Sequence, residues 1–269
     1  MIAESEPELP PIAALRGVWK SFDGRPVLRG LDLNIETGRS LVVMGPSGCG
    51  KSVMLKHIVG LLRPDAGEVS FKGERVDEMS ERRFSPIRRR IGFLFQSAAL
   101  FDSMTVRENV AFPLLETGQA GPDLEERVRR TLDRVGLADS LDQMPSELSG
   151  GMRKRVGLAR AIVLEPEMVL YDEPTTGLDP IRANVINDLI IRLQRELNIT
   201  SVVVTHDLDS AFQVADRLVL LHEGQVRLDA TPDEMRHSED PVVRSFLEGR
   251  ELPPHAAEQA RSNPASMPS

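Results

Sequence analysis

The sequence of 269 residues contains a single cysteine, Cys49, and lacks any long apolar run. One cysteine permits no internal disulfide and no cysteine metal cluster, so a reducing cytoplasm fits. No apolar stretch reaches the roughly 18 residues that a membrane-spanning helix needs. The first residues, MIAESEPELPP, lack the basic and then apolar pattern of a signal peptide. We therefore expect a chain that neither spans a membrane nor enters the secretory route.

Positive charge is also scarce, because 33 lysine and arginine residues stand against 41 acidic residues, giving a formal net charge of −8. This is the wrong sign for a chain whose main partner is nucleic acid, so we expect no nucleic-acid partner. Hydrophobic residues at 41% and charged residues at 28% are typical of a globular protein. The length allows one large or two-lobed domain with a sizeable core.

Two kinds of periodicity divide the chain. Helical spacing of apolar residues predicts a helix with Asp179 at its N-cap and Pro180 in its first turn, and another opened by Asp123 and closed by Gly136. The block at about 97–160 is mainly helical and is inserted in an α/β core. Alternating or β-branched runs predict strands at 14–20, 27–35, 40–44, 69–71, 91–95, 168–171, 201–205 and 217–221.

The ordered domain is expected at 14–249, with tails at 1–13 and 250–269. The tails are rich in Pro, Ala, Ser and Glu, which predicts mobility in the isolated chain, although the second tail can become ordered on a partner. Two dipeptides, Asp23-Gly24 and Glu223-Gly224, are typical of hairpin turns.

The most specific motif follows the strand at 40–44 and precedes a helix. Its glycines let consecutive backbone N–H groups converge on phosphate oxygens at the positive end of that helix. Lys51 adds a positive charge toward the outer phosphates, and Ser52 offers a hydroxyl to Mg²⁺. Cys49 fills a variable slot and is interpreted as an inert thiol. The motif matches the P-loop pattern and comprises Gly45, Pro46, Ser47, Gly48, Cys49, Gly50, Lys51 and Ser52.

A pair of carboxylates ends the buried strand at 168–171. Because side chains alternate in direction along a strand, Asp172 is predicted to face a Mg²⁺ ion and Glu173 a water molecule, for which it is the candidate base. The strand at 201–205 ends at His206, so an imidazole is expected at the same sheet edge, within reach of the outermost phosphate. The other four histidines are interpreted as structural.

A weaker motif, Leu148-Ser149-Gly150-Gly151-Met152, precedes a helical run and offers a hydroxyl and amides to a second anion. Its position after the P-loop and before the carboxylate pair, with Gln96 between, resembles the nucleotide-binding subunits of ABC transporters over about 14–249. The resemblance implies an α/β fold with a RecA-like mixed sheet, an antiparallel β subdomain and an inserted α-helical subdomain. It implies that Phe22 is the aromatic shelf for adenine, that Gly45 to Ser52 are the Walker A loop, and that Gln96 is the Q-loop glutamine and a Mg²⁺ ligand. Ser149, Gly150 and Gly151 would form the signature loop. Asp172 would be the Walker B aspartate, Glu173 the catalytic carboxylate, Asp179 the D-loop acid and His206 the switch histidine.

Two positions depart from the pattern or fit it loosely. The fifth signature residue is Met152 where the family commonly has glutamine, so any polar contact of that amide is lost while Ser149 and the glycine amides remain. The assignment of Phe22 as the adenine shelf has an alternative, because an aromatic residue on a strand often packs in a core, and Trp19 lies near it in the sequence.

Several segments narrow the resemblance to the ATPase subunit of Mla or Mce-type lipid transporters. They are LFQSAALFDSMTVRENVAFPL, MPSELSGGM and DPVVRSFLEG. This implies phospholipid movement between bacterial membranes through a separate permease, with further lipid-binding subunits and a peripheral location on the cytoplasmic face of the inner membrane. The alternatives are an ATPase for another importer class and a cytosolic assembly ATPase.

The mechanism implied by the family is hydrolysis of Mg²⁺-ATP by a homodimer, in which Lys51 and Ser52 of one copy hold ATP against Ser149 and Gly150 of the other. Charge stabilisation and positioning dominate such phosphoryl transfer. A DNA-maintenance ATPase is excluded because no long coiled coil separates the P-loop from the signature. A translation ATPase normally carries two sets of motifs, whereas this chain has one. A non-hydrolysing regulatory module conflicts with the presence of both Glu173 and His206.

Overall fold

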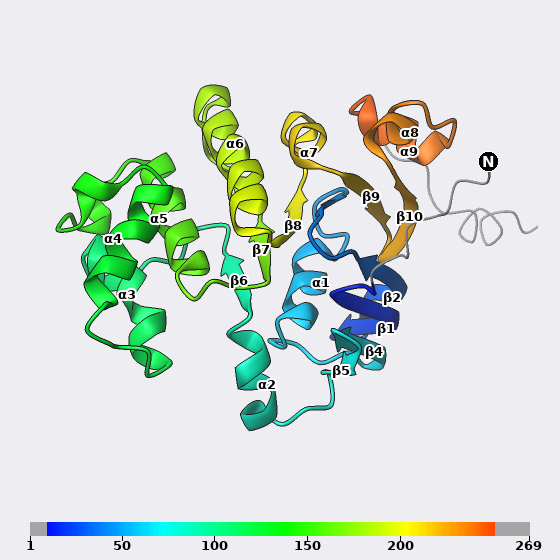
Figure 1. The fold of residues 1–269 in the computed structure, drawn as a ribbon. Coiled ribbons are helices and arrows are strands. Elements are labelled where there is room, and N and C mark those ends of the chain that lie inside the picture. The colour runs from blue at the N-terminus through cyan, green and yellow to red at the C-terminus, as the bar shows by residue number, and fades with distance from the viewer. Residues whose placement is uncertain (1–9, 251–269) are drawn as a thin grey trace, which may run out of the picture.

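The computed structural model describes residues 10–250, and its strands form two sheets (Figure 1). The first sheet is antiparallel with the order β2-β1-β4-β5 and consists of β1 (Ala13–Phe22), β2 (Arg25–Ile35), β4 (Ala66–Phe71) and β5 (Glu74–Arg75). The second has the order β10-β9-β3-β8-β7-β6 and consists of β3 (Ser40–Met44), β6 (Ile91–Leu94), β7 (Met168–Asp172), β8 (Thr200–Thr205), β9 (Arg217–His222) and β10 (Gln225–Ala230). Only β10 is antiparallel to its neighbour in this second sheet. The predicted α/β architecture with a mixed sheet and an antiparallel subdomain is confirmed.

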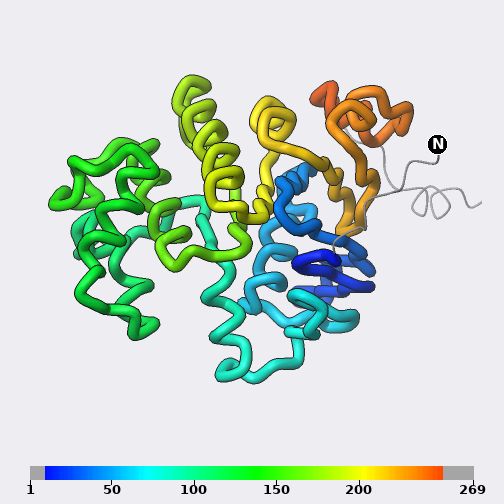
Figure 2. Tube along the Cα trace, viewed as in Figure 1, coloured from blue at the N-terminus to red at the C-terminus, as the bar shows by residue number. Residues whose placement is uncertain are grey.

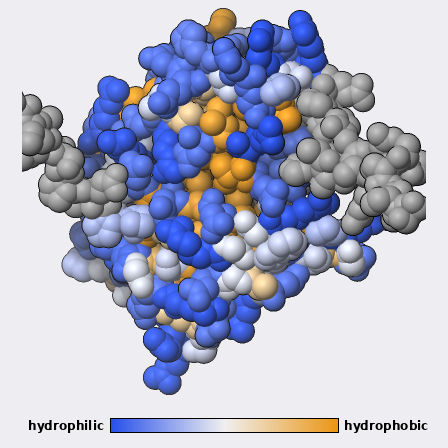
Figure 3. Space-filling model, turned by 90° about the vertical axis from the view of Figure 1, so that its right-hand side faces the viewer, coloured by the Kyte–Doolittle hydropathy of each residue, from blue (hydrophilic) through white to orange (hydrophobic). Residues whose placement is uncertain are grey.

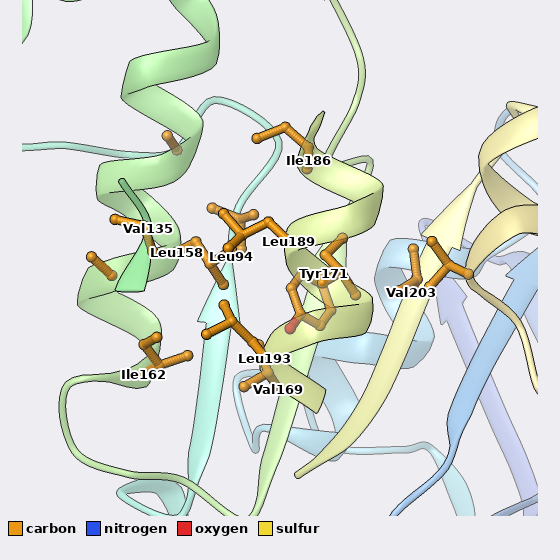
Figure 4. Close-up of a cluster of buried hydrophobic side chains, with 14 of the residues drawn as sticks. Leu94, Val135, Leu158, Ile162, Val169, Tyr171, Ile186, Leu189, Leu193 and Val203 are labelled. Carbon is orange, nitrogen blue, oxygen red and sulfur yellow. The ribbon is translucent and has the colours of Figure 1, made fainter. Parts of the chain in front are cut away.

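The mixed sheet is the middle layer of the molecule, because its strands bury side chains on both faces. Along β3, Val42 and Met44 enter one hydrophobic cluster, whereas Leu41 and Val43 enter the other. The strand β7 alternates in the same way, and its Tyr171 lies among the leucines of the neighbouring helices (Figure 4). Strands buried on both faces read as continuous apolar runs, which is why these were recognisable in the sequence.

The helices fall into two groups. Around the sheets lie α1 (Lys51–Ile58), α2 (Glu81–Arg88), α6 (Pro180–Leu197), α7 (Leu208–Val214), α8 (Pro232–Arg236) and α9 (Pro241–Leu247). A separate lobe contains α3 (Val106–Glu116), α4 (Leu124–Arg134), the 3-10 turns η1 (Ala138–Ser140) and η2 (Pro145–Glu147), and α5 (Gly150–Ile162). The chain leaves the mixed sheet after β6, passes through this lobe and returns along α5 to β7 (Figure 2). The inserted helical lobe is therefore confirmed.

Capping explains where several helices begin. Asp179 accepts a hydrogen bond from the Arg182 amide at 3.0 Å, and Pro180 follows in the first turn, as predicted. Asp123 precedes α4 as predicted but makes no side-chain cap, and its backbone, with φ −93 and ψ 4, lacks the extended conformation typical of a capping residue. Gly136 follows that helix at φ +67, the left-handed conformation that ends helices.

Some boundaries differ from those predicted. Ile12 and Ala13 are buried, and the Ile12 amide donates to the Ile35 carbonyl, so the ordered sheet begins before residue 14. Residues 1–9 of the predicted N-terminal tail and 251–269 of the predicted C-terminal tail lie outside the described residues. Both predicted hairpin turns are present, and the second leads into β10, which the sequence did not reveal as a separate strand. The short β5 was also missed.

Hydrophilic side chains dominate the face that carries β1, β2 and β10, and the largest group of hydrophobic ones lies near its middle (Figure 3). Among the residues that the structure describes, no helix is both long enough and apolar enough to cross a membrane.

Candidate active site

Three neighbouring parallel strands bring the motifs to one edge of the mixed sheet. In the ladders, Met44 of β3 pairs with Thr205 of β8, and Asp172 of β7 pairs with Val204 of β8. The P-loop directly follows β3, the carboxylate pair spans the end of β7, and His206 directly follows β8. The carboxyl edge of a parallel sheet is where such folds bind ligands, so the predicted convergence of these motifs is confirmed.

The P-loop closes tightly against the sheet. A Cβ added to Gly45, whose φ is +150, would lie 2.2 Å from the Leu221 carbonyl oxygen, so a side chain is excluded here. The following helix α1 begins at Lys51 with Gly50 as N-cap, and no side chain caps its first amides. Those amides are donors without intrahelical partners. Together with the positive end of the helix, they fit a phosphate chain.

Lys51 lies folded over this loop and is only 7% exposed. Its Nζ donates to the carbonyl oxygens of Gly45 at 2.6 Å and Pro46 at 3.1 Å. The neighbouring Cys49 is buried, and burial raises the pKa of its thiol. A buried thiol held in its protonated form is unreactive, which agrees with its interpretation as an inert loop residue.

Ser52 and Asp172 meet across the base of the site. The Ser52 hydroxyl donates to Asp172 Oδ1 at 2.8 Å, joining α1 to the end of β7. Burial raises the pKa of Asp172, and the negative charge of Glu173 raises it further, while the Ser52 hydrogen bond lowers it. A carboxylate and a hydroxyl form an oxygen donor set that suits a hard divalent cation, and such a cation would neutralise the buried negative charge of Asp172 next to Glu173. The two residues thus fit Mg²⁺.

Glu173 points in a different direction from Asp172. Its Oε2 accepts from the Thr176 hydroxyl at 3.2 Å and lies 2.9 Å from Nδ1 of His206, while Thr205 Oγ1 stands at 3.5 Å. Its backbone adopts a φ of +50, which is rare for a residue with a side chain. Strain of this kind collects at functional sites and costs about 1–3 kcal/mol. The expected division of the two acids between different neighbours is present.

Three residues near Glu173 were not singled out from the sequence. Thr176 and Thr205 are contacts that only the fold brings into reach. Lys154 is a buried lysine on α5 whose Nζ donates to the carbonyl oxygens of Gln96 and Glu173. The available signal was its spacing, because Lys154 lies four residues before Leu158 on the apolar face of the helix.

The remaining predicted site residues lie around this centre. Gln96 is exposed two residues after β6, and its backbone reaches the site through Lys154. Phe22 ends β1, is 41% exposed and has Lys20 Nζ 5.6 Å from its ring centroid, so it does not pack in a core. Asp179 caps α6. Their roles toward a nucleotide stay predictions.

The signature residues stand apart from the P-loop of the same chain. Ser149 caps α5 by accepting from the Met152 amide at 3.3 Å, and Gly150 and Gly151 form the first turn. In Figure 1, α5 belongs to the lobe on the left, whereas α1 lies beyond β7 and β8. One copy of the chain therefore does not bring its signature residues to its own P-loop.

The sequence matches the model of the family described as ABC transporter over residues 28–176, more than half of the chain. The fold, with its P-loop, carboxylate pair and helical lobe, agrees with that match. The chain belongs to the ABC transporter family, and it is an ATPase of the ABC type that binds adenine nucleotides.

The chain is similar to several ATP-binding proteins of known or assigned transport systems. The chain is 41% identical over 236 residues to the intermembrane phospholipid transport system ATP-binding protein MlaF of Escherichia coli K12, covering 87% of this chain and 88% of MlaF. It is 40% identical over 241 residues to the probable ribonucleotide transport ATP-binding protein mkl of Mycobacterium leprae, covering 89% and 70%. The fold is similar, with a TM-score of 0.76 and 33% identity, to the dimeric post-hydrolysis structure of the ATP-binding cassette MJ0796 with ADP and Pi, covering 82% and 98%.

Proposed function

We propose that this chain powers phospholipid transport of the Mla or Mce type through a separate membrane permease, as a peripheral subunit on the cytoplasmic face of a bacterial inner membrane. The observation that carries the substrate class is the similarity to MlaF along almost its whole length. The second candidate is an importer of another substrate, because mkl, named for ribonucleotide transport, is almost as similar.

Nucleotide binding uses the groups around the P-loop. Phe22 stacks on adenine, the amides at the start of α1 hold the phosphates, and Lys51 moves its ammonium from the carbonyls of Gly45 and Pro46 to the outer phosphates. Ser52, Asp172 and Gln96 are the oxygen donors for Mg²⁺. Bound there, the ion neutralises charge on the phosphate oxygens.

Hydrolysis depends on Glu173. Its carboxylate orients the attacking water and accepts its proton. His206, at 2.9 Å, holds that carboxylate from the other side and carries an exposed ring edge that can reach the outermost phosphate. Thr176 supports the same Oε2. Accurate placement of the water dominates the rate in phosphoryl transfer, since there is little covalent chemistry for the protein to do.

A second copy of the chain completes the site. Ser149 is exposed at the start of α5 and lies in the lobe remote from its own P-loop. Two copies facing head to tail place Ser149, Gly150 and Gly151 of one on the outer phosphate held by Lys51 of the other. The dimeric state of MJ0796 supports this arrangement. Loss of the outer phosphate then weakens the dimer.

Glu173→Gln tests this function. We expect retained ATP binding, loss of turnover, and accumulation of a dimer in ATP, measured by phosphate release and light scattering. Glu165→Gln is a matched control, because Glu165 also has a positive φ of +53 but pairs with Arg130 on the surface. Wild-type turnover in Glu173→Gln, or an ATP-saturated variant that stays monomeric, contradicts the proposal.

The permease is proposed to contact the lobe beside the turn that follows Gln96. Phe101 is 41% exposed there, with its ring centroid 4.7 Å from that of Phe112. Leu100→Asp with Phe101→Asp is expected to abolish co-purification with the membrane complex while ATP binding stays intact. Leu115→Asp, at another exposed apolar position of the lobe, is the control. Unchanged assembly of the double variant contradicts this contact.

The transported substrate is tested on the purified complex. Phospholipid is expected to co-purify with it and to be identified by mass spectrometry. ATP-dependent uptake of ribonucleotides into proteoliposomes, without lipid movement, would instead favour the second candidate.

A further inference from the structure

Lys154 is a lysine in an unusual place. It lies on α5, five residues after Ser149, and is only 5% exposed. Its Nζ donates to the Gln96 carbonyl oxygen at 2.5 Å and to the Glu173 carbonyl oxygen at 3.1 Å. These two carbonyls belong to separate segments, one after β6 and one after β7. A single ammonium thus ties the signature helix to both segments.

Burying an ammonium group is costly unless it is paired and hydrogen-bonded. The two carbonyl oxygens supply the hydrogen bonds, and the carboxylates of Glu173 and Asp172 supply negative charge nearby. Burial nevertheless lowers the pKa of Lys154. An apolar residue would fill this position in a helix whose next buried residues are Val156, Gly157 and Leu158. The charge of Lys154 at this buried position is explained by the two backbone segments that its ammonium group binds.

What it holds is the backbone of Glu173. That residue has a φ of +50, and its amide donates to the Val204 carbonyl oxygen at 2.9 Å. Its carbonyl oxygen accepts from Lys154 and, at 3.3 Å, from the Thr176 amide. The peptide groups on both sides of the strained Cα are therefore fixed. From this fixed backbone the carboxylate reaches His206.

We propose that Lys154 is a positioning residue for ATP hydrolysis. Its ammonium holds the backbones of Gln96 and Glu173 together, so that the carboxylate and the glutamine side chain face one bound nucleotide in a fixed relation. This inference rests on the roles proposed above for Glu173 and Gln96. Because Lys154 sits on the helix that Ser149 opens, a shift of α5 when the dimer closes moves the carbonyls that it holds.

Lys154→Met keeps the length of the side chain and removes its donors. In the purified full-length chain we expect kcat for ATP to fall about 10- to 100-fold, since a displacement of about 1 Å at reacting groups has effects of this size. KM and the affinity for a non-hydrolysable ATP analogue are expected to stay within about threefold. Lys154→Gln retains an N–H donor and is expected to give a kcat between those of Lys154→Met and the wild type.

Arg155→Met is the matched control. Arg155 is the next residue of α5 and also donates to two backbone carbonyls, those of Val135 and Gly136, each at 3.2 Å, but within the lobe. Its loss is expected to leave kcat within about twofold. A comparable fall in kcat in Arg155→Met would show a general effect of loosening the helix and would overturn the proposal.

Other outcomes decide the remaining cases. A kcat of Lys154→Met within twofold of the wild type, or a change confined to KM, overturns the inference. If Lys154→Met does not fold, wild-type kcat in Lys154→Gln overturns it in the same way. Glu173→Gln is measured in parallel. Turnover lost in Glu173→Gln but normal in both Lys154 variants removes only this inference, whereas normal turnover in Glu173→Gln removes the proposed catalytic role itself.

Discussion

A methyl group added at Gly157 tests how closely the signature helix must approach the segment after β6. Gly157 lies in the middle of α5, and its added Cβ would stand 2.8 Å from Leu94 Cδ1, 3.1 Å from Ala98 Cβ and 3.3 Å from the Ala98 carbonyl oxygen. Ala98 itself has a φ of +62, so the turn that follows Gln96 has little freedom to move aside. Gly157→Ala therefore forces either the leucine or the turn to shift.

Two opposing effects set the magnitude. Alanine is favoured over glycine inside a helix by about 1 kcal/mol. Overpacking a well-filled interior costs about 1–3 kcal/mol. We expect Gly157→Ala to lower the free energy of unfolding by up to about 2 kcal/mol, even though an exposed helical position would gain from the same change.

The clash with Leu94 is separated by a double-mutant cycle. Leu94→Ala alone removes a fully buried side chain and is expected to cost about 2–5 kcal/mol. In that background the methyl group at position 157 enters vacated space, so it is expected to be neutral or stabilising, with a coupling of about 1–3 kcal/mol between the sites. Urea unfolding followed by circular dichroism measures all four proteins. Additivity within about 0.5 kcal/mol would refute the packing argument.

Two further predictions concern the site. Burial raises the pKa of Asp172 above its unfolded value, so its contribution to stability is present at low pH and is lost as the pH rises through the folded-state pKa. Asp172→Asn is therefore expected to unfold about 2–4 °C higher than the wild type at neutral pH without nucleotide, and this gain is expected to shrink in acid. A lower melting temperature of Asp172→Asn at neutral pH, measured by calorimetry, would contradict this. Base stacking on an aromatic ring is worth about 1–3 kcal/mol. Phe22→Ala is therefore expected to raise the Kd for ATP about 5- to 100-fold, while Phe22→Tyr changes it little. If fluorescence titration gives Phe22→Ala the same Kd as the wild type, Phe22 is not part of the adenine site.

The parts of the site that the sequence predicted share one physical origin. Lys51, Asp172 and His206 each follow a continuous apolar run, and such runs are strands buried on both faces. Neighbouring parallel strands end at the same edge of the sheet, so this placement can be predicted without predicting the loops between them. Local capping was predictable for similar reasons at Asp179, whose acceptor lies next to its own helix.

Features that depend on contacts between distant segments were not predictable in this way. The left-handed backbone of Glu173 has no local cause, because glutamate has no preference for positive φ. The interactions of Thr176 and Thr205 with its carboxylate form only after β7 and β8 pair. Lys154 is buried on the apolar face of α5 although lysine is almost always exposed, so its residue type alone gave no indication of its place in the site.

These contacts give α5 two constraints on one short segment. Gly157 lets the helix approach the turn at Ala98, and Lys154, one turn earlier, binds the Gln96 carbonyl at the start of that turn. A methyl group that pushes the turn outward must lengthen the Lys154 hydrogen bond or pull Glu173 with it. Gly157→Ala should thus reduce kcat as well as stability. In the Leu94→Ala background the added methyl group should no longer reduce stability but should still reduce kcat, because Ala98 remains in the way.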